Sequence, residues 1–305
     1  MKTFLTCFLV GLVSLAANAQ FKKAEISQIK NKFLDIPYAT LSKAEQLDVY
    51  LPDEGDGPFP AIVSIHGGAF LGGDKRDGEE TPMLEGLKRG YAVVSVNYRL
   101  SQEATWPAQI YDCKAAVRWI KANAKKYKLD PDKIAAWGGS AGGQLAALLG
   151  TSGGVKSLED TTMGNPEQSS RVQAVVDWFG PTDFLKMDEQ LKESHEEHPL
   201  PASVPNSPAS LLLGKNIVDV PDLVRQADPD TYISADDPPF LIQHGLEDNI
   251  VPFEGSILLA RKLGRVLGYQ KVYLELFPAT GHEGPAFFTE ENAKIVFLFL
   301  DKFMK

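Results

Sequence analysis

The sequence of 305 residues contains only two cysteines, Cys7 and Cys113. Cys7 lies in an N-terminal leader that we expect to be removed, so Cys113 is left without a partner for an internal disulfide. Cys113 falls in a helical pattern, and no constellation of histidine and asparagine that could activate its thiol surrounds it. We therefore expect a buried, inert thiol. The fold must therefore be stable without disulfides, and a chain of this length can bury a core large enough for that.

The sequence also lacks an apolar run of the about 20 residues that a bilayer crossing requires. Its longest N-terminal apolar run, Phe4–Ala17, follows the positively charged Lys2 and leads into Ala17-Asn18-Ala19. Small residues at these positions are what signal peptidase needs. We expect residues 1–19 to be a signal peptide cleaved after about Ala19, which places the mature protein in the periplasm or outside the cell. A transmembrane anchor is the alternative, and no stable membrane insertion is expected.

Signals for nucleotides, metals and nucleic acids are missing as well. The formal net charge of −9 disfavours nucleic acid and anionic membranes as partners. There is no GxGxxG loop and no cluster of metal ligands, and the segment Gly72–Arg76 lacks the spacing of a phosphate-binding Walker loop. We therefore expect no metal and no cofactor. The sequence makes no prediction of the oligomeric state.

Short apolar segments alternate with helical patterns along the chain. The predicted strands are Gln46–Leu51, Ala61–Ile65, Ala92–Val96, Lys133–Trp137, Val172–Phe179, Phe240–Gln243 and Val272–Phe277. The predicted helices lie near Glu79–Arg89, Gln109–Tyr127, Ala141–Leu149, Gly255–Leu267 and Ala286–Met304. This alternation indicates an α/β fold with a mainly parallel, doubly wound sheet of about eight strands and helices on both faces. Because no linker or repeat interrupts it, residues 20–305 are expected to form a single domain.

One stretch, at about residues 183–237, breaks this alternation. It carries no long strand pattern and is rich in proline, at Pro199, Pro201, Pro205, Pro208, Pro221 and Pro229. An insertion of this length inside a compact domain is usually a lid or a binding loop. We expect it to shape the substrate pocket.

The most informative segment is Lys133–Leu145, which predicts a strand, a tight turn and then a helix. Within it, Gly138-x-Ser140-x-Gly142 is the pattern of a nucleophile elbow. The turn strains the backbone of the serine, and glycines two residues away on either side avoid clashes. The helix N-terminus and the N–H of Ala141 favour negative charge on a substrate oxygen. Ser140 is therefore predicted to be the nucleophile of a serine hydrolase.

A second glycine-rich segment follows another apolar strand. His66-Gly67-Gly68 is the type of loop that completes an oxyanion hole with backbone N–H groups. A simple glycine-rich turn between a strand and a helix is the alternative interpretation. The predicted donors are the main-chain N–H groups of Gly67 and Gly68 with that of Ala141, and His66 is expected to orient the loop.

A nucleophilic serine needs a base, and the base needs an orienting acid. His282 lies in a glycine-flanked loop after the last predicted strand, from which its imidazole can reach the elbow. Asp248 lies in the loop after the preceding strand and is preferred to its neighbour Glu247. The chain order Ser140, Asp248, His282 is the order that this fold uses. The other histidines are expected to be structural or solvated, namely His66, His195, His198 and His244.

Taken together, these segments resemble the α/β-hydrolase carboxylesterases related to hormone-sensitive lipase. The similarity is greatest to their feruloyl and acetyl xylan esterase-like branch in Bacteroidetes, and it covers nearly all of the chain after the leader. The motifs that carry it are His66-Gly67-Gly68, Asn97–Leu100, Trp106-Pro107, Asp112 with Ala115–Trp119, Gly138–Gly143, Asp237–Phe240, His244–Pro252 and Gly281-His282. The resemblance implies a Ser140–His282–Asp248 triad and an oxyanion hole from Gly67 or Gly68 with Ala141. Ala69 departs from it, because many relatives carry a third glycine there, but alanine still offers its N–H.

The residues and the resemblance predict a carboxylic ester hydrolase that acts through an acyl-enzyme. Its expected partner is a small-molecule or polysaccharide-linked ester, such as an acetyl or feruloyl ester of plant polysaccharide. Two alternatives remain open. A peptidase of the prolyl-oligopeptidase type has the same order of triad residues, although such enzymes usually place an aromatic residue where this chain has Ala141. An inactive binding protein on the same fold is the other, although such proteins usually lose a triad member.

Overall fold

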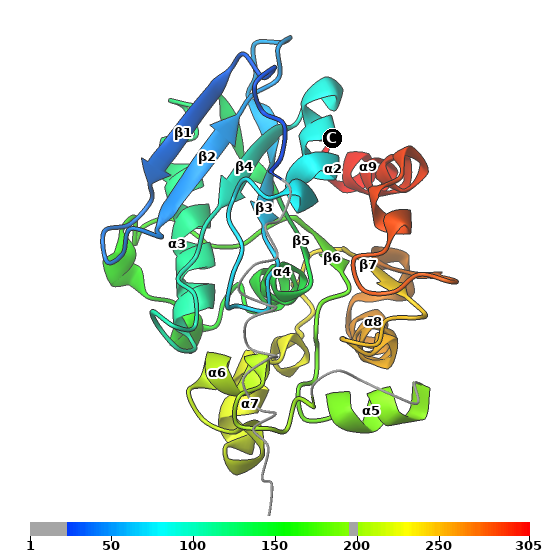
Figure 1. The fold of residues 1–305 in the computed structure, drawn as a ribbon. Helices are drawn as coiled ribbons and strands as arrows, with labels where there is room; N and C mark the ends of the chain where they lie inside the picture. Colours follow the sequence, from blue (N-terminus) through cyan, green and yellow to red (C-terminus); the bar gives the residue numbers. More distant parts are fainter. Residues whose placement is uncertain (1–22, 195–200) are drawn as a thin grey trace, which may run out of the picture.

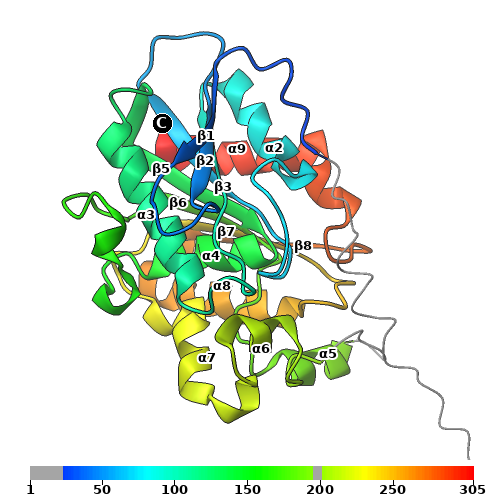
Figure 2. The same ribbon diagram turned by 60° about the vertical axis from the view of Figure 1, so that its left-hand side comes forward.

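The computed structural model describes residues 23–194 and 201–305. The predicted signal peptide, together with His195 and His198, lies outside the described residues. The sheet has eight strands in the order β1-β2-β4-β3-β5-β6-β7-β8, shown in Figures 1 and 2. Strand β2 pairs antiparallel with β1 and with β4, and the other neighbours are parallel. The expected mainly parallel sheet is therefore confirmed.

All strands except the first follow the predicted segments closely. They are β1 (Lys32–Pro37), β2 (Gln46–Tyr50), β3 (Phe59–Ile65), β4 (Ala92–Val96), β5 (Leu129–Gly139), β6 (Ala174–Trp178), β7 (Phe240–Gly245) and β8 (Val272–Phe277). The central strands alternate between two apolar cores, because successive side chains of a strand point to opposite faces. In β3, for example, Val63 and Ile65 belong to one core and Ile62 belongs to the other. Both faces of the sheet are thus covered by helices.

The helices divide between these two faces. They are α2 (Thr81–Leu84), α3 (Ala108–Asn123), α4 (Ala141–Thr151), α5 (Met187–Ser194), α6 (Pro208–Leu213), α7 (Pro221–Ala227), α8 (Phe253–Leu267) and α9 (Glu290–Met304). Helices α3, α4 and α8 contribute to one core, and α2 and α9 contribute to the other. None of the helices in the described parts of the chain is long and apolar enough to span a bilayer.

The first strand, β1, was not expected from the sequence. Its side chains are mostly exposed, and Phe33 and Leu34 on it are 44% and 38% accessible. It pairs with β2 at the edge of the sheet, and the register shifts between Phe33 and Ile36. A strand that is held by edge pairing rather than by burial leaves no apolar pattern in the sequence, which is why it was missed.

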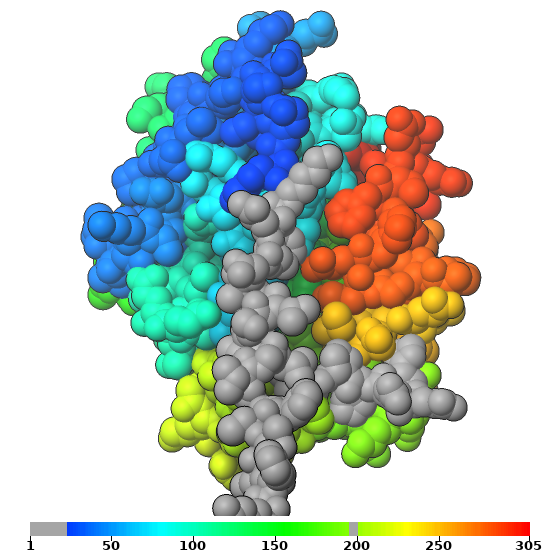
Figure 3. Space-filling view, in the orientation of Figure 1, coloured from blue at the N-terminus to red at the C-terminus, as the bar shows by residue number. Residues whose placement is uncertain are grey.

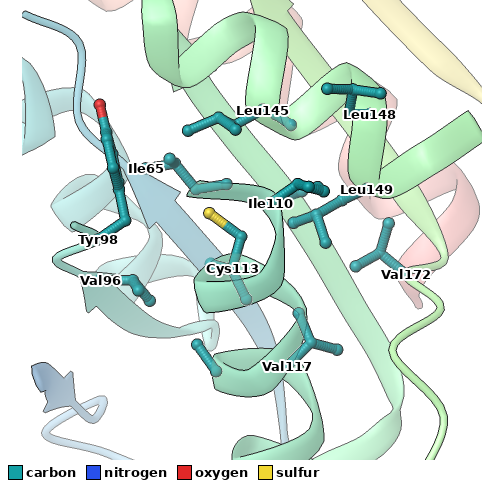
Figure 4. Packing of buried hydrophobic residues seen from close by; sticks show 14 of the residues in the cluster. Ile65, Val96, Tyr98, Ile110, Cys113, Val117, Leu145, Leu148, Leu149 and Val172 are labelled. Carbon is teal, nitrogen blue, oxygen red and sulfur yellow. The ribbon is translucent and has the colours of Figure 1, made fainter. Parts of the chain in front are cut away.

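Cys113 is buried in the core between α3 and the sheet, where it packs with Ile65, Val117 and Leu145 (Figure 4). Burial raises the pKa of its thiol well above the usual value. A thiol in this environment stays protonated and is shielded from reagents. This agrees with its predicted role as a buried, inert residue.

The stretch between β6 and β7 carries helices α5, α6 and α7, together with short 3₁₀ turns. Helices α6 and α7 begin with prolines, Pro208 and Pro221, which fit the first turn of a helix. These helices lie at the lower end of the molecule in the space-filling view, and the C-terminal segments lie at the right (Figure 3). Helix α4, which begins directly after the predicted nucleophile Ser140, lies near the centre of the molecule in Figure 1.

Candidate active site

Ser140 lies at the sharp turn between β5 and α4, with φ of 53° and ψ of −121°. Its N–H donates to Trp178 O at 2.9 Å, and its carbonyl accepts from Gln144 N at 3.0 Å. Gly142 permits this turn because a Cβ there would lie 2.0 Å from Ile65 O, and a Cβ at Gly138 would lie 2.4 Å from Gly142 O. The strained serine is the feature that an elbow motif predicts.

The three side chains predicted as a triad meet at this turn. His282 Nε2 lies 2.9 Å from Ser140 Oγ, and His282 Nδ1 lies 2.7 Å from Asp248 Oδ2. Asp248 follows β7 and His282 follows β8, so neighbouring parallel strands bring both loops to the same edge as Ser140. The ring of Phe179 packs edge-on against His282 with centroids 4.8 Å apart, which restricts the imidazole.

Asp248 is fully buried and accepts four hydrogen bonds. Its Oδ1 accepts from the N–H groups of Ile250 and Val251, and its Oδ2 accepts from His282 and also from His244. Burial alone would raise the pKa of Asp248, but the hydrogen bonds from the two histidines hold it below the usual range. Asp248 is therefore ionised and can stabilise a positive charge on an imidazole. Glu247, the rejected alternative, is exposed.

The loop after β3 has a rigid support. The His66 ring is buried and stacks on Tyr98 with centroids 4.3 Å apart, and Tyr98 Oη donates to the carbonyls of His66 and Gly67. Burial lowers the pKa of His66, which keeps the ring neutral. The position of His66 beneath the loop fits the predicted orienting role.

The prediction that Gly67 donates to an oxyanion needs correction. The Gly67 N–H already donates to Glu79 Oε2 at 3.0 Å, so it is occupied by a carboxyl group of the protein. The backbone then turns through Gly68, Ala69 and Phe70, with φ of 96°, 56° and 61°. Ala69 lines the same pocket as Ser140 and Ala141. The candidate N–H donors that remain in this region are those of Gly68 and Ala69, with that of Ala141 at the first position of α4, where a helix leaves the N–H unpaired.

Glu79 was not singled out in the sequence, because no motif marks it. Its carboxyl joins the loop of Gly67 to the loop of His282, where Glu283 is its hydrogen-bonding neighbour. Burial and the charge of Glu283 raise the pKa of Glu79 to about 8, although the Gly67 N–H acts in the opposite direction. Glu79 is therefore mostly protonated at neutral pH, which removes its repulsion with Glu283.

The raised pKa of Glu79 predicts that the stability of the fold depends on pH. Glu79→Gln should weaken this dependence. A carboxyl whose pKa is higher in the folded state stabilises the fold fully below the unfolded value of 4.5, and this contribution is lost as the pH rises through about 8. Glutamine keeps an acceptor for Gly67 and cannot ionise. We expect the melting temperature of the wild type to fall by a few degrees more than that of the variant between pH 5 and pH 9. Parallel melting curves over this range would contradict the prediction.

An apolar pocket opens beside Ser140 and Ala141. Its volume is about 120 Å³, and the stretch between β6 and β7 supplies most of its wall, with Phe184, Met187, Ala202 and Ala209. Ile250 and Val251, next to Asp248, close another side. A larger hollow of about 500 Å³, lined in part by Ile29 and Leu84, contains none of the predicted site residues. We regard the smaller pocket as the functional one because it contains the serine.

Of the predicted site residues, the structure brings together Ser140, Asp248 and His282 through hydrogen bonds, and Ala141 lines the same pocket as Ser140. Gly68 lies one residue before Ala69, which also lines that pocket. Ala69 was expected to keep its N–H but was not among the predicted donors. The residues that sequence reasoning missed are Glu79, Phe179 and Glu283. They act through packing between segments far apart in the chain.

The sheet order, the strained serine between β5 and α4 and the loops after β7 and β8 are those of an α/β-hydrolase. A solved structure described as a truncated form of carbohydrate esterase from gut microbiota is similar over 92% of this chain and 99% of its own, with a TM-score of 0.82 and 33% identity. An acetyl ester-xyloside bifunctional hydrolase from Caldicellulosiruptor lactoaceticus is similar over 85% of this chain and 86% of its own, with a TM-score of 0.66 and 27% identity.

Comparison of the sequence with known protein families and with curated proteins identifies the family of this chain. The model of the BD-FAE family matches residues 47–263, and the chain belongs to this family. The probable carboxylic ester hydrolase LipM of Mycobacterium tuberculosis is 35% identical over 256 residues, which are 81% of this chain and 55% of LipM. The chain thus spans about half the length of the curated relatives that it matches. The resemblance to α/β-hydrolase esterases is confirmed.

Proposed function

We propose that this protein is a serine carboxylesterase that hydrolyses short acyl esters through an acyl-enzyme. Ser140 is the nucleophile, His282 is the general base and then the general acid, and Asp248 orients His282. The observation that carries the proposal is the continuous chain of hydrogen bonds from Ser140 Oγ through His282 to Asp248, beside an apolar pocket. The esterase names of relatives in the same family support it.

The reaction follows from these positions. His282 Nε2 takes the proton of Ser140 as Oγ attacks the ester carbonyl, and the ionised Asp248 stabilises the imidazolium that forms. The developing oxyanion accepts hydrogen bonds from the N–H groups of Gly68, Ala69 and Ala141. His282 then gives the proton to the leaving alcohol. A water molecule, activated by the same imidazole, releases the acid and restores Ser140.

The size of the pocket favours a short acyl group. An apolar cavity of about 150 Å³ holds one benzene molecule, and this pocket has only about 120 Å³. An acetyl group fits such a space, whereas a feruloyl group does not. A sugar-sized alcohol is also too large for it, so the alcohol side must face the open side of Ser140. This arrangement, with the carbohydrate esterase and acetyl ester-xyloside hydrolase names of similar structures, supports acetylated polysaccharide or oligosaccharide as substrate.

A panel of esters tests this assignment. We expect kcat/KM to decrease from acetyl to butyryl to octanoyl p-nitrophenyl esters, methyl ferulate to be a poor substrate and acetylated xylan to be deacetylated. A fluorophosphonate probe should label the protein. Absence of both labelling and ester turnover would contradict ester hydrolysis, and a preference for a peptidyl anilide would indicate a peptidase. Turnover of simple esters without release of acetate from xylan would contradict the polysaccharide part only.

Met187→Ala should widen the acyl pocket, because this side chain forms part of its wall. We expect the ratio of kcat/KM for the octanoyl ester to kcat/KM for the acetyl ester to rise roughly tenfold. Space for one or two methylenes in an apolar pocket changes the preference between two substrates by about this factor. Leu298→Ala is a suitable control, because Leu298 is 71% exposed on α9 and does not line the pocket. An unchanged ratio would show that the acyl chain lies elsewhere.

Export from the cytoplasm is part of the same proposal. It is supported by Lys2, the uncharged run Phe4–Ala17 and the small residues before the expected cleavage point after Ala19. N-terminal sequencing of the protein recovered from the periplasm or the medium tests it. A first residue at about Gln20 is expected, and an intact N-terminus on a protein retained in the cytoplasm would contradict it.

A further inference from the structure

One buried histidine near the proposed triad has no role in the mechanism given so far. His244 lies at the end of β7, and its Nε2 is 3.1 Å from Asp248 Oδ2, the same oxygen that His282 contacts at 2.7 Å. His244, Asp248 and Ser256 are each fully buried. The carboxylate thus receives one imidazole from each side.

The partners of His244 determine where its proton lies. Its Nε2 faces two acceptors, Asp248 Oδ2 and the carbonyl of Val251 at 3.0 Å, so Nε2 carries the hydrogen. Its Nδ1 lies 2.7 Å from Ser256 Oγ on α8. A neutral imidazole with hydrogen on Nε2 accepts at Nδ1, so the Ser256 hydroxyl donates there. The two acceptors at Nε2 thus set the tautomer in which His244 donates to Asp248, and the Ser256 hydroxyl supports it by donating to Nδ1.

We infer that His244 and Ser256 are positioning residues that hold Asp248 for His282, an inference that rests on the proposed ester hydrolysis at Ser140. The hydrogen bonds form one continuous chain, from Ser256 to His244 to Asp248 on one side and from Ser140 to His282 to Asp248 on the other.

Asp248 needs such support because of its place in the fold. It lies in the loop between β7 and α8, whereas His244 lies on the strand and Ser256 lies in the first turn of the helix. The two backbone N–H groups on Oδ1 come from the same loop, at Ile250 and Val251, so they move with Asp248. His244 is the contact that ties Oδ2 to the sheet, and sites held by strands and helices are positioned more accurately than sites held by loops.

The size of the effect follows from the kind of hydrogen bond. The free energy of a buried hydrogen bond to a charged group corresponds to a change in rate of roughly tenfold to a hundredfold. If His244 acts through Asp248, its loss lowers kcat and leaves KM nearly unchanged, because the apolar pocket stays intact. A residue that only fills space in the core would change the melting temperature without this selective effect on kcat.

The experiment is a double-mutant cycle in the full chain, with p-nitrophenyl acetate as substrate. His244→Phe keeps a ring and removes the donor, and we expect kcat to fall roughly tenfold to a hundredfold. His244→Gln, which restores an N–H donor, should recover part of this loss. Ser256→Ala should lower kcat about threefold to tenfold. In an Asp248→Asn background, neither His244→Phe nor Ser256→Ala should cause a further loss of more than about twofold.

A matched control is Ser152→Ala, at a buried serine whose hydroxyl donates to Leu148 O within the end of α4. It should leave kcat unchanged. Equal losses from Ser256→Ala in the wild-type and Asp248→Asn backgrounds, or no loss in either, would overturn the inference. The Ser256 cycle decides the matter if His244→Phe does not fold. A wild type without turnover or probe labelling would instead overturn the proposed function itself.

Discussion

Ser140→Ala is expected to lower kcat for acetyl esters by at least about 10⁴-fold while the protein remains folded. The variant removes the oxygen that attacks the ester carbonyl and leaves His282 with no hydroxyl to deprotonate. The backbone at this position keeps its φ of 53°, since alanine and serine tolerate that region about equally. The measurement is turnover of p-nitrophenyl acetate, together with labelling by a fluorophosphonate and a thermal melt.

The matched control for this variant is Ser152→Ala, because Ser152 caps the other end of the same helix. Both variants remove one hydroxyl from a buried serine, and the Ser152 hydroxyl donates its hydrogen bond to Leu148 O within its own helix. The control should keep full turnover and full labelling. Turnover that persists in Ser140→Ala, or labelling that moves to another residue without loss of rate, would show that a different group is the nucleophile.

The central sheet could be predicted from the sequence because burial on both faces leaves a strong apolar signal. Strands β3, β4, β6 and β7 are mostly apolar and almost fully buried, and the predicted segments overlap them, whereas β1 has exposed side chains and gave no signal. The segment Glu79–Arg89 was expected to be one helix, but it forms a four-residue α-helix flanked by 3₁₀ turns. Pro82 fits only the first turn of a helix, so it prevents one continuous helix from Glu79, and Gly86 disfavours continuation beyond Leu84.

Local motifs also predicted the residues of the candidate site whose roles depend on backbone geometry. The Gly138-x-Ser140-x-Gly142 turn and the loops of Asp248 and His282 are of this kind. The carboxyl of Glu79 on the Gly67 N–H is different, because it depends on how two segments pack. No spacing rule connects these residues, so the sequence could not show that the N–H of Gly67 is occupied. For the same reason the contact of Ser256 with His244 was not foreseen.

Gly142→Ala is expected to unfold or strongly destabilise the protein, by about 3 kcal/mol or more, and to abolish turnover. An added Cβ would lie 2.0 Å from the carbonyl oxygen of Ile65 and 2.7 Å from that of His66. Both obstacles are backbone atoms, so no side-chain rotation can relieve them. The N-terminus of α4 would have to move away from β3, and this movement would separate Ser140 from the loop of Gly68.

Gly72→Ala is the matched control for this last prediction. Gly72 belongs to the same loop as Gly68, but a Cβ there meets no heavy atom within 4 Å, and its φ lies outside the left-handed region. The same added methyl group should therefore change stability by less than about 0.5 kcal/mol. Urea unfolding of both variants, with p-nitrophenyl acetate turnover, provides the comparison. If Gly142→Ala were as stable and active as Gly72→Ala, close packing of α4 on β3 would not be what holds Ser140 beside its oxyanion loop.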